Sequence, residues 1–275
     1  MDMQNTIGDQ SHDVTVLDTV ELRDLLENVF ESTFVDELIP GILHNFANPL
    51  NGIMGRAQIL QRRLNETIAK IGVQYPEAAN AFADMHKKLV TDVGSICLES
   101  DRFYNMFQDV SGKLYTIGSD VVERINLSRL LASELRFNDY YLDFKHEIMK
   151  ELSLNDSLPE INGIASYYSL CFWSLFRHAM VRMRTVADKT LFVTASYDDT
   201  YVSVTIKYEG LSLTETESDV VDGILSGRDI NPADPAINAS YYYLSLCLLK
   251  KMGALISIRK DGTYHETVIK VAYIK

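Results

Sequence analysis

Two long stretches of the sequence carry apolar residues at steps that alternate between four and three. In the first stretch these residues are Ile39, Leu43, Phe46, Leu50, Ile53, Ala57, Leu60 and Leu64. In the second they are Leu89, Val93, Ile96, Phe103, Phe107, Val110 and Leu114, with the polar Ser100 at the position between Ile96 and Phe103. This is the heptad period that helices keep when they pack nearly parallel in a bundle. Gly72 and Pro76 interrupt it, so the pattern predicts two long antiparallel helices joined by a turn.

A hairpin of two helices has two apolar seams and cannot enclose a core by itself. Pairing with a second copy would bury both seams in a four-helix bundle. The sequence therefore predicts a homodimer whose hairpins form this bundle.

After Gly118 the pattern changes to short alternating strands and apolar helices. Strands are expected at 121–127, 146–152, 191–195, 201–208, 254–259 and 267–273. Helices are expected at 128–144, 164–183 and 241–252, and residues 212–238 are expected to form a polar, partly ordered loop. The fold class is α+β. We divide the chain into a disordered or frayed lead-in (1–20), the helical hairpin (21–117) and a second domain (120–275).

The composition excludes several classes of function. The 275 residues carry a formal net charge of −12, which argues against nucleic acid and against an anionic membrane surface as partners. The longest apolar run, at 167–176, is too short to span a bilayer, and the polar N-terminus is unlike a signal peptide. The 3 cysteines are widely spaced and lack ligand spacing, so we expect a cytoplasmic protein with no metal and no cofactor.

A polar stripe runs along the first predicted helix. It consists of His44, Asn48, Asn51, Gly55, Gln58 and Arg62. A solvated face is the usual explanation of such a stripe. However, Gly55 costs helix stability unless something approaches the backbone there, and Pro49 removes a backbone hydrogen bond within a turn of His44. The stripe is therefore a candidate docking surface with a reactive histidine at one end.

The stretch from His44 to Leu50 reads His-Asn-Phe-Ala-Asn-Pro-Leu, followed by Ile53, Gly55 and Ala57. It resembles the phosphoacceptor box of sensor histidine kinases, which lies on the first helix of a dimerisation and phosphotransfer hairpin. The resemblance implies that His44 is the phosphorylated residue and that Asn51, Gly55, Gln58 and Arg62 bind a response-regulator receiver domain.

Two residues beside His44 bear on its reactivity. The family usually has Asp or Glu directly after the histidine, which accepts a proton from the ring, whereas this chain has Asn45. An amide can orient the ring but cannot take a proton. Attack on ATP should therefore suffer more than attack on an aspartyl phosphate. Asn48 matches the family position that is associated with dephosphorylation of the regulator.

The second half resembles the ATP-binding domain of the same kinases, at residues 124–128, 167–183 and 253–258, so the resemblance spans roughly 35–275. The family's nucleotide residues are nevertheless missing. The positions of its asparagine pair hold Ser174 and His178, and the adenine-reading aspartate is replaced by Tyr208, two residues before Gly210. No glycine occurs between Gly227 and Gly253, where a phosphate-binding loop is expected. The resemblance therefore implies a degenerate nucleotide site.

These features favour a histidine phosphotransferase of a phosphorelay that carries phosphate between receiver-domain aspartates through His44 without binding ATP. Three alternatives remain open. The first is a pseudokinase scaffold that binds a receiver domain or a histidine kinase without phosphotransfer. The second is an active kinase with unusual nucleotide boxes, and the third is a globular protein in which His44 is structural.

Overall fold

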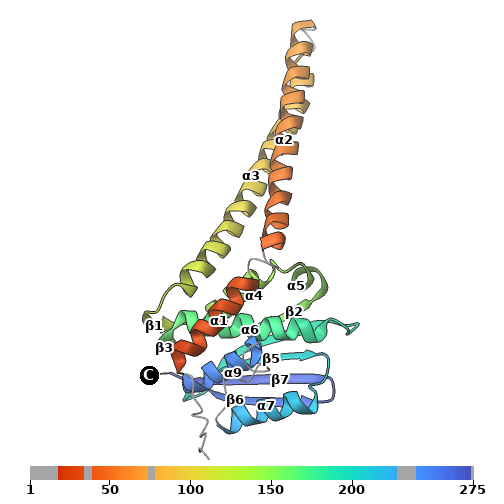
Figure 1. The fold of residues 1–275 in the computed structure, drawn as a ribbon. Helices are drawn as coiled ribbons and strands as arrows, with labels where there is room; N and C mark the ends of the chain where they lie inside the picture. The colour runs from red at the N-terminus through yellow and green to blue at the C-terminus, as the bar shows by residue number, and fades with distance from the viewer. Residues whose placement is uncertain (1–17, 34–38, 74–77, 228–239, 274–275) are drawn as a thin grey trace, which may run out of the picture.

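The computed structural model describes residues 18–33, 39–73, 78–227 and 240–273, with some side chains of the long helices excepted. A helical hairpin projects from one side of an α/β sandwich (Figure 1). The α+β class predicted from the sequence is confirmed. The predicted turn at Pro76 and part of the predicted polar loop, residues 228–239, lie outside the described residues.

The hairpin consists of α2 (Ile39–Val73) and α3 (Ala78–Ile117), which pack against each other along their length. Phe46 and Phe103 meet edge to face between them, with ring centroids 5.2 Å apart. Asp92 of α3 is buried and pairs with both Arg56 and Arg63 of α2. A buried carboxylate is costly unless it is paired, so this contact opposes any slip of one helix along the other.

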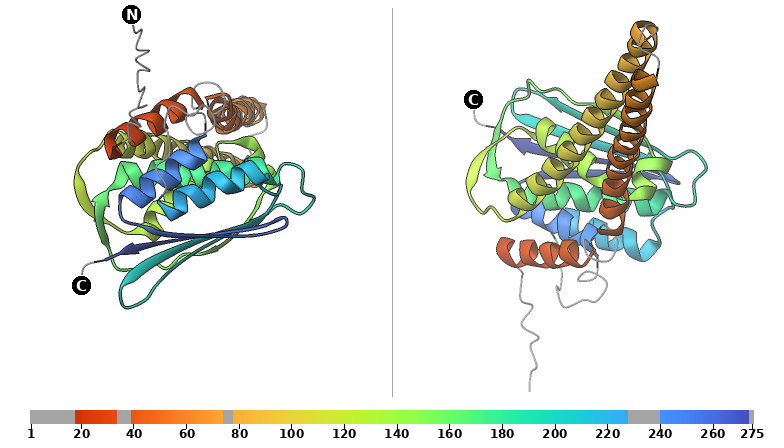
Figure 2. Two further views of the ribbon diagram at one scale, coloured as in Figure 1. Left: turned by 60° about the horizontal axis from the view of Figure 1, so that its bottom comes forward. Right: turned by 90° about the horizontal axis from the view of Figure 1, so that it is seen from above.

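The sandwich is built on a five-stranded sheet with the order β2-β4-β5-β7-β6. Its strands are β2 (Met149–Ser153), β4 (Thr190–Tyr197), β5 (Tyr201–Glu209), β6 (Leu255–Asp261) and β7 (Tyr264–Ala272). Only the β2–β4 pair is parallel. Alternate residues of β5 and β7 are buried, and the helices lie on that one face of the sheet (Figure 2).

The helices of the sandwich are α4 (Leu127–Asn138), α5 (Leu142–Glu147), α6 (Ala165–Met183), α7 (Glu215–Ser226) and α9 (Tyr241–Lys251). Two short strands, β1 (Val122–Ile125) and β3 (Ile161–Ile164), pair antiparallel beside them. Asn126 caps α4, because its side chain accepts a hydrogen bond from the Arg129 backbone N–H.

Two predictions about these helices were wrong. The helix predicted over 128–144 is two helices, because α4 ends at Asn138 and α5 begins at Leu142. Part of the predicted polar loop is the helix α7. It begins with a capping box, in which Thr214 and Glu217 each bond the other's backbone N–H. This reciprocal cap satisfies N–H groups that the first turn of a helix leaves unpaired.

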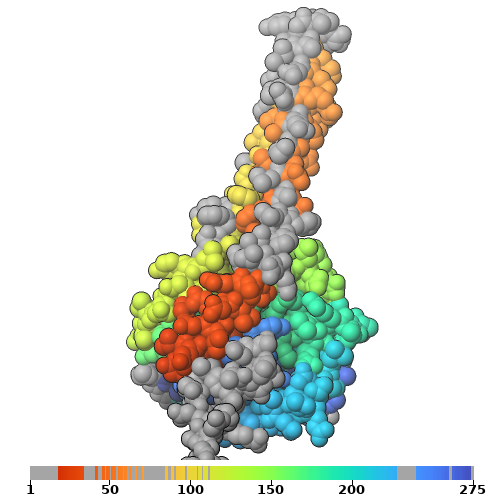
Figure 3. Space-filling view, viewed as in Figure 1, coloured from red at the N-terminus to blue at the C-terminus, as the bar shows by residue number. Residues whose placement is uncertain are grey.

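The helix α1 (Thr19–Thr33) does not extend the hairpin, although residues 21–117 were predicted to form that domain. It packs against α9 and α6 of the sandwich instead, and it lies across this helical layer at the surface (Figure 3). Leu22, Leu26 and Phe30 form its buried stripe, and Phe30 meets Trp173 edge to face at 5.1 Å. An apolar stripe of three residues therefore closes the sandwich core.

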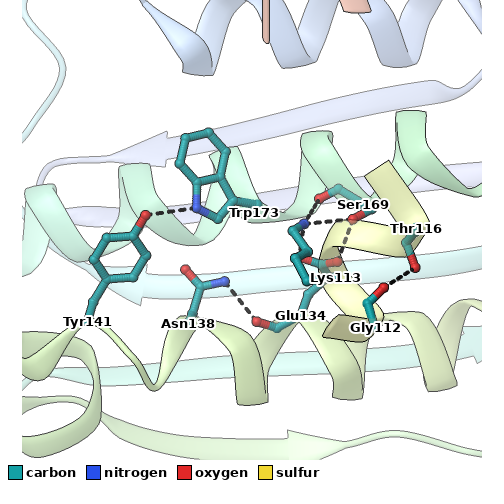
Figure 4. A network of polar contacts seen from close by, with 8 residues as sticks. All are labelled: Gly112, Lys113, Thr116, Glu134, Asn138, Tyr141, Ser169 and Trp173. Carbon is teal, nitrogen blue, oxygen red and sulfur yellow. Dashed lines mark hydrogen bonds and ion pairs between the residues drawn. The ribbon is translucent and has the colours of Figure 1, made fainter. Parts of the chain in front are cut away.

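A buried polar network joins the end of the hairpin to the sandwich (Figure 4). Lys113 of α3 donates to Glu134 Oε2 and to Ser169 Oγ, both at 2.6 Å, and Ser169 Oγ donates to Glu134 Oε1 at 2.6 Å. The side chains of Lys113 and Glu134 are both 2% exposed. Nearby, Tyr140 donates to the Met106 carbonyl at 2.8 Å. These contacts fix the base of α3 against α4 and α6.

Candidate functional site

His44 lies in the second turn of α2, and the start of α2 is the end of that helix that lies next to the sandwich (Figure 1). The structure describes its backbone but not its side chain. The neighbouring Asn45 is buried, and its amide Nδ2 donates to the Gly41 carbonyl at 2.8 Å. Its Oδ1 accepts from Lys145 of α5 at 2.5 Å. The Asn45 amide therefore bonds to the preceding turn of α2 at one end and to α5 at the other.

The other residues of the predicted stripe follow along α2 away from the sandwich. The side chains of Asn48, Asn51 and Arg62 are exposed. The side chain of Gln58 is not among those that the structure describes. Among the described residues outside its own turn of helix, no atom would lie within 4 Å of a Cβ added to Gly55. No contact within the described part of this chain accounts for a glycine at that position.

The predicted nucleotide positions come together where α6 and α9 face β5 and β7. The Ser174 hydroxyl of α6 donates to the Tyr241 carbonyl at 2.6 Å. The ring of His178, one turn further along α6, stacks on the ring of Tyr242, with centroids 3.7 Å apart and planes 8° apart. Ser174 and His178, the two positions that the family resemblance aligns with an asparagine pair, thus contact the start of α9.

A second stack lies beside the first. The ring of Tyr208 on β5 stacks on that of His265 on β7, with centroids 4.9 Å apart and planes 13° apart. His265 Nε2 lies 2.9 Å from the Leu211 carbonyl. Tyr208, Tyr242 and His265 are each less than 10% exposed, at 6%, 4% and 3%. Burial raises the pKa of both tyrosines, so the phenols stay neutral.

Packing against Arg182 requires a glycine at position 210. A Cβ atom at Gly210 would lie 2.9 Å from the Arg182 carbonyl oxygen and 2.9 Å from the Arg182 Cβ. Arg182 in turn forms an ion pair with Glu217 of α7. The Gly210 N–H donates to the Thr263 carbonyl at 2.8 Å. The backbone after β5 is therefore pressed directly against the end of α6.

The sequence interpretation identified Ser174, His178, Tyr208 and Gly210 but missed the two rings that complete the stacks, Tyr242 and His265. Tyr242 lies in the helix expected at 241–252, and nothing in the sequence indicated its partner. His265 carried no signal, because its pairing with Tyr208 depends on the register of β5 against β7. We call the four stacked rings of Tyr208, Tyr242, His178 and His265 the aromatic cluster.

The aromatic cluster makes the stability of the fold sensitive to acid. Burial lowers the pKa of His178 to about 3, with Arg182 and His265 adding to the effect. The buried Nε2 of His178 has no hydrogen-bond partner among the described residues. The folded chain therefore keeps this ring neutral, whereas the unfolded chain binds a proton with a pKa near 6.5. The contribution of His178 to the free energy of unfolding is therefore complete above about pH 6.5 and decreases as the pH falls towards 3.

We expect wild type to lose about 2 kcal/mol more free energy of unfolding than His178→Phe between about pH 7 and pH 5, since each pH unit below the unfolded pKa is worth about 1.4 kcal/mol. Phenylalanine keeps a ring against Tyr242 but takes up no proton. Urea unfolding at the two pH values measures the difference. His146→Gln, at an exposed position on α5, should keep the wild-type pH dependence. Equal pH dependence in wild type and His178→Phe would contradict this assignment.

The architecture defined by these elements is a helical hairpin joined to a sandwich with a mixed sheet, which agrees with the histidine-kinase-type fold that the sequence resemblance implies. No family model matches the chain, and no curated protein matches it. Solved structures do match. The histidine kinase AdeS of Acinetobacter baumannii is 14% identical with a TM-score of 0.42, over 80% of this chain and 96% of that one.

Two further solved structures are similar to parts or most of the chain. A catalytic domain of the histidine kinase ThkA is 15% identical with a TM-score of 0.44, over 55% of this chain and 97% of that one. A structure described as a bacterial phosphotransferase is 14% identical with a TM-score of 0.42, over 93% of this chain and 98% of that one. At this level of identity the likeness concerns the fold alone.

The described residues lack two features. Of the helices in the described part of the chain, none combines the length and the apolar character that crossing a bilayer requires. In those same ranges, no group of three or more His, Cys, Asp or Glu side chains is arranged to hold a metal ion.

Proposed function

We propose that the chain is a histidine phosphotransferase of a two-component phosphorelay. His44 accepts a phosphoryl group from the aspartate of one receiver domain and passes it to the aspartate of another. The sandwich positions the hairpin and does not bind ATP. The observation that carries the proposal is the aromatic cluster, which occupies the nucleotide positions with the chain's own side chains while the helix that bears His44 is intact.

The chemistry needs only a neutral imidazole and a reactive donor. The lone pair of a His44 ring nitrogen forms a bond to phosphorus, the bond between phosphorus and the aspartyl oxygen breaks, and the carboxylate leaves with its electron pair. Attack by a carboxylate of a second receiver reverses the step. An acyl phosphate has a good leaving group, so the transfer depends less on a strong base beside His44. Asn45, whose amide is engaged by Gly41 and Lys145, is not such a base.

Loss of ATP binding follows from three features of the sandwich. A purine would have to displace the buried ring of Tyr208, which is stacked on His265. Mg²⁺ prefers oxygen ligands, whereas Ser174 is bonded to the Tyr241 carbonyl and His178 offers an imidazole. The stretch between Gly227 and Gly253 holds no glycine with which to wrap phosphates. Opening this site would cost the burial of several aromatic rings.

The receiver domain docks on the polar stripe of α2, close to His44. The exposed Asn48, Asn51 and Arg62 supply hydrogen-bonding groups, and Gly55 leaves the helix backbone open to a partner. Asn48, one turn beyond His44, can orient a water or a phosphoryl oxygen. The space around Gly55 supports this assignment, because glycine inside a helix costs about 1 kcal/mol relative to alanine.

Gly55→Ala should stabilise the chain by about 1 kcal/mol and yet slow phosphotransfer. A methyl group in a packed interface costs about 1–3 kcal/mol, which corresponds to a loss of roughly tenfold or more in receiver affinity. Gly112→Ala on α3 is the matched control, because among the described residues outside its own turn of helix no atom lies within 4 Å of a Cβ there, and the neighbouring Lys113 ties this part of α3 to the sandwich. It should stabilise the chain without affecting transfer. Equal transfer rates in both variants would remove Gly55 from the docking surface.

The hairpin pairs with that of a second copy. Leu98 and Val93 of α3 are 66% and 45% exposed, which is unfavourable on a long helix unless a partner covers them. Light scattering should give twice the 31.1 kDa mass of one chain. A mass of one chain at micromolar concentration would contradict the homodimer and leave the phosphotransfer proposal standing.

The decisive test of the proposed function is a comparison of phosphate donors. Response-regulator receiver domains are labelled at their aspartate with radioactive acetyl phosphate, and the chain is incubated with them or with labelled ATP. Label should pass to the chain from a receiver and not from ATP. Label from ATP would overturn the proposal in favour of an active kinase. Tight receiver binding without label from either donor would favour a scaffold instead. A nucleotide site filled by the aromatic cluster is consistent with that alternative as well.

A further inference from the structure

The turn of α2 that carries His44 contacts the sandwich both before and after the histidine. Before it, Gly41 packs so closely on the Tyr140 carbonyl that an added Cβ would lie 2.1 Å from that oxygen. After it, the buried Asn45 accepts a hydrogen bond from Lys145 Nζ at 2.5 Å. Tyr140 lies in the connection from α4 to α5, and Lys145 lies in α5. His44 is therefore flanked by two contacts with one segment of the sandwich.

The bond from Lys145 reaches α2 at a place where the helix lacks one of its own hydrogen bonds. Pro49 lies inside α2 and has no N–H, so it cannot donate to the Asn45 carbonyl as a residue four positions later normally does. The backbone at Asn45 is thus less constrained by the helix itself. The contacts that this turn makes with the sandwich therefore contribute more to its orientation than they would in a regular helix.

The amide of Asn45 is suited to both of its contacts. A side-chain amide offers a donor and an acceptor. The Asn45 Nδ2 donates to the Gly41 carbonyl at 2.8 Å, and its Oδ1 accepts from Lys145. A carboxylate at this position would still accept from Lys145, but it would have no hydrogen to donate to the Gly41 carbonyl. Asparagine thus connects the turn before His44 to α5 in a way that aspartate cannot.

We propose that Lys145 is a positioning residue for phosphotransfer at His44. Through the Asn45 side chain, Lys145 fixes the turn of α2 that presents the phosphoacceptor to a receiver domain. It neither attacks phosphorus nor takes up a proton. Its effect arises because the attacking and accepting atoms must lie close together and in line, and a misplacement of about 1 Å can cost roughly 100-fold in rate. The inference rests on the proposed function of His44.

Single-turnover transfer from labelled receiver domains, at increasing concentrations of the chain, separates positioning from docking. Lys145→Met removes the donor to Asn45 at an exposed position, so it opens no cavity in the core. The saturating rate of transfer should fall about tenfold or more, because the turn is no longer held in place. The half-saturating concentration should not change, because the docking residues of the stripe are untouched. Lys145→Arg keeps a charged donor and should restore most of the rate.

Lys189→Met is the matched control, since it removes the same charge from a lysine that pairs with Glu147 of α5 rather than with α2. It should transfer at the wild-type rate. An equal loss of rate in both lysine variants would assign the effect to net charge and overturn the inference. A rate in Lys145→Met equal to that of wild type would overturn it as well, while the proposed function would stand. A wild-type chain that takes no label from any receiver domain would refute both.

Two further measurements test the route through Asn45. In an Asn45→Ala background, Lys145→Met should have no additional effect on the rate, because residues that act through one contact are not additive. A full additional loss would show that Lys145 acts directly and would contradict a positioning role. Hydrogen exchange of the segment 39–50 needs no receiver domain. It should be faster in Lys145→Met than in wild type or Lys189→Met, and equal exchange in all three would contradict the anchoring of this turn.

Discussion

His44→Ala should reduce the label that the chain receives from a phosphorylated receiver domain by at least ~1,000-fold, because alanine offers no nucleophile and removing a nucleophile costs an enzyme this much or more. The measurement is the transfer of radioactive phosphate from labelled receiver domains, followed on protein gels. Acid treatment adds a check, since a phosphorylated imidazole loses its label in acid. Labelling by ATP should be at background in both proteins.

The control for this loss is His146→Ala, at an exposed position on α5 in the sandwich. It should accept label at the wild-type rate. Thermal unfolding of His44→Ala should match that of wild type, so that loss of label is not loss of fold. Label that persists in His44→Ala would move the acceptor to another residue. Receiver binding that is retained without label in wild type would support the scaffold reading.

Lys113→Met should lower the free energy of unfolding by about 3–5 kcal/mol, because it leaves the carboxylate of Glu134 buried without its cation. Lys113 and Glu134 are 2.6 Å apart and 2% exposed, and the ammonium group also lies 5.4 Å from the ring centroids of Phe30 and Phe137. Burial lowers the pKa of Lys113 despite the opposing effect of Glu134. The close contact between Lys113 and Glu134 therefore offsets the cost of burying them. A variant that keeps only one of the two charges is strongly destabilised. Urea unfolding measures the loss.

Two further variants show whether the loss of stability in Lys113→Met comes from an unpaired buried charge or from the loss of an ion pair as such. The double variant Lys113→Met with Glu134→Leu replaces the pair with apolar side chains, and it should recover most of the lost stability. Arg136→Met breaks the exposed ion pair with Asp109, which also joins α4 to α3. It should cost less than about 1 kcal/mol, because solvent already screens that pair. A loss no greater for Lys113→Met than for Arg136→Met would show that the buried network contributes nothing to the attachment of the hairpin.

Local patterns were sufficient to predict several elements. The heptad spacing from Ile39 and from Leu89 predicted α2 and α3, because a period near 3.5 is compatible only with packed helices. The closing strands β6 and β7 turn around Asp261 and Gly262, as the sequence indicates, and Gly262 has a φ of 60° that favours glycine. These elements are specified by residues that lie close together in the chain.

Other elements were missed because their signals are short or depend on a distant partner. The strand β3 has only four residues and exists through its pairing with β1. The capping box of α7 was present in the sequence as Thr214 and Glu217, but the acidic composition around it suggested a loop. The helix α1 was visible as a helix, whereas its docking on α9 and α6 rather than on the hairpin was not.

The candidate site also has features that the sequence predicted and features that only the structure shows. The identities of Ser174, His178 and Tyr208 predicted a changed nucleotide site from the sequence alone. The structure was needed to show that Tyr208 stacks on His265 of the neighbouring strand and that His178 stacks on Tyr242 between two helices. Asn45 was expected to orient His44, but its amide bonds Gly41 and Lys145, and Lys145 is 100 residues away in the chain.

The sequence by itself determined the helical hairpin, the α+β character of the second half and the position of His44, and it showed that Ser174, His178 and Tyr208 differ from the residue types that the family resemblance leads one to expect. Those features depend on period and on residue identity within short windows. Only the tertiary structure decided that Lys113 is paired with Glu134 and Ser169, that α1 closes the sandwich, and that Lys145 of α5 bonds Asn45 at the start of α2. Each of these contacts joins segments whose meeting depends on how the whole core packs, and no local period encodes that packing.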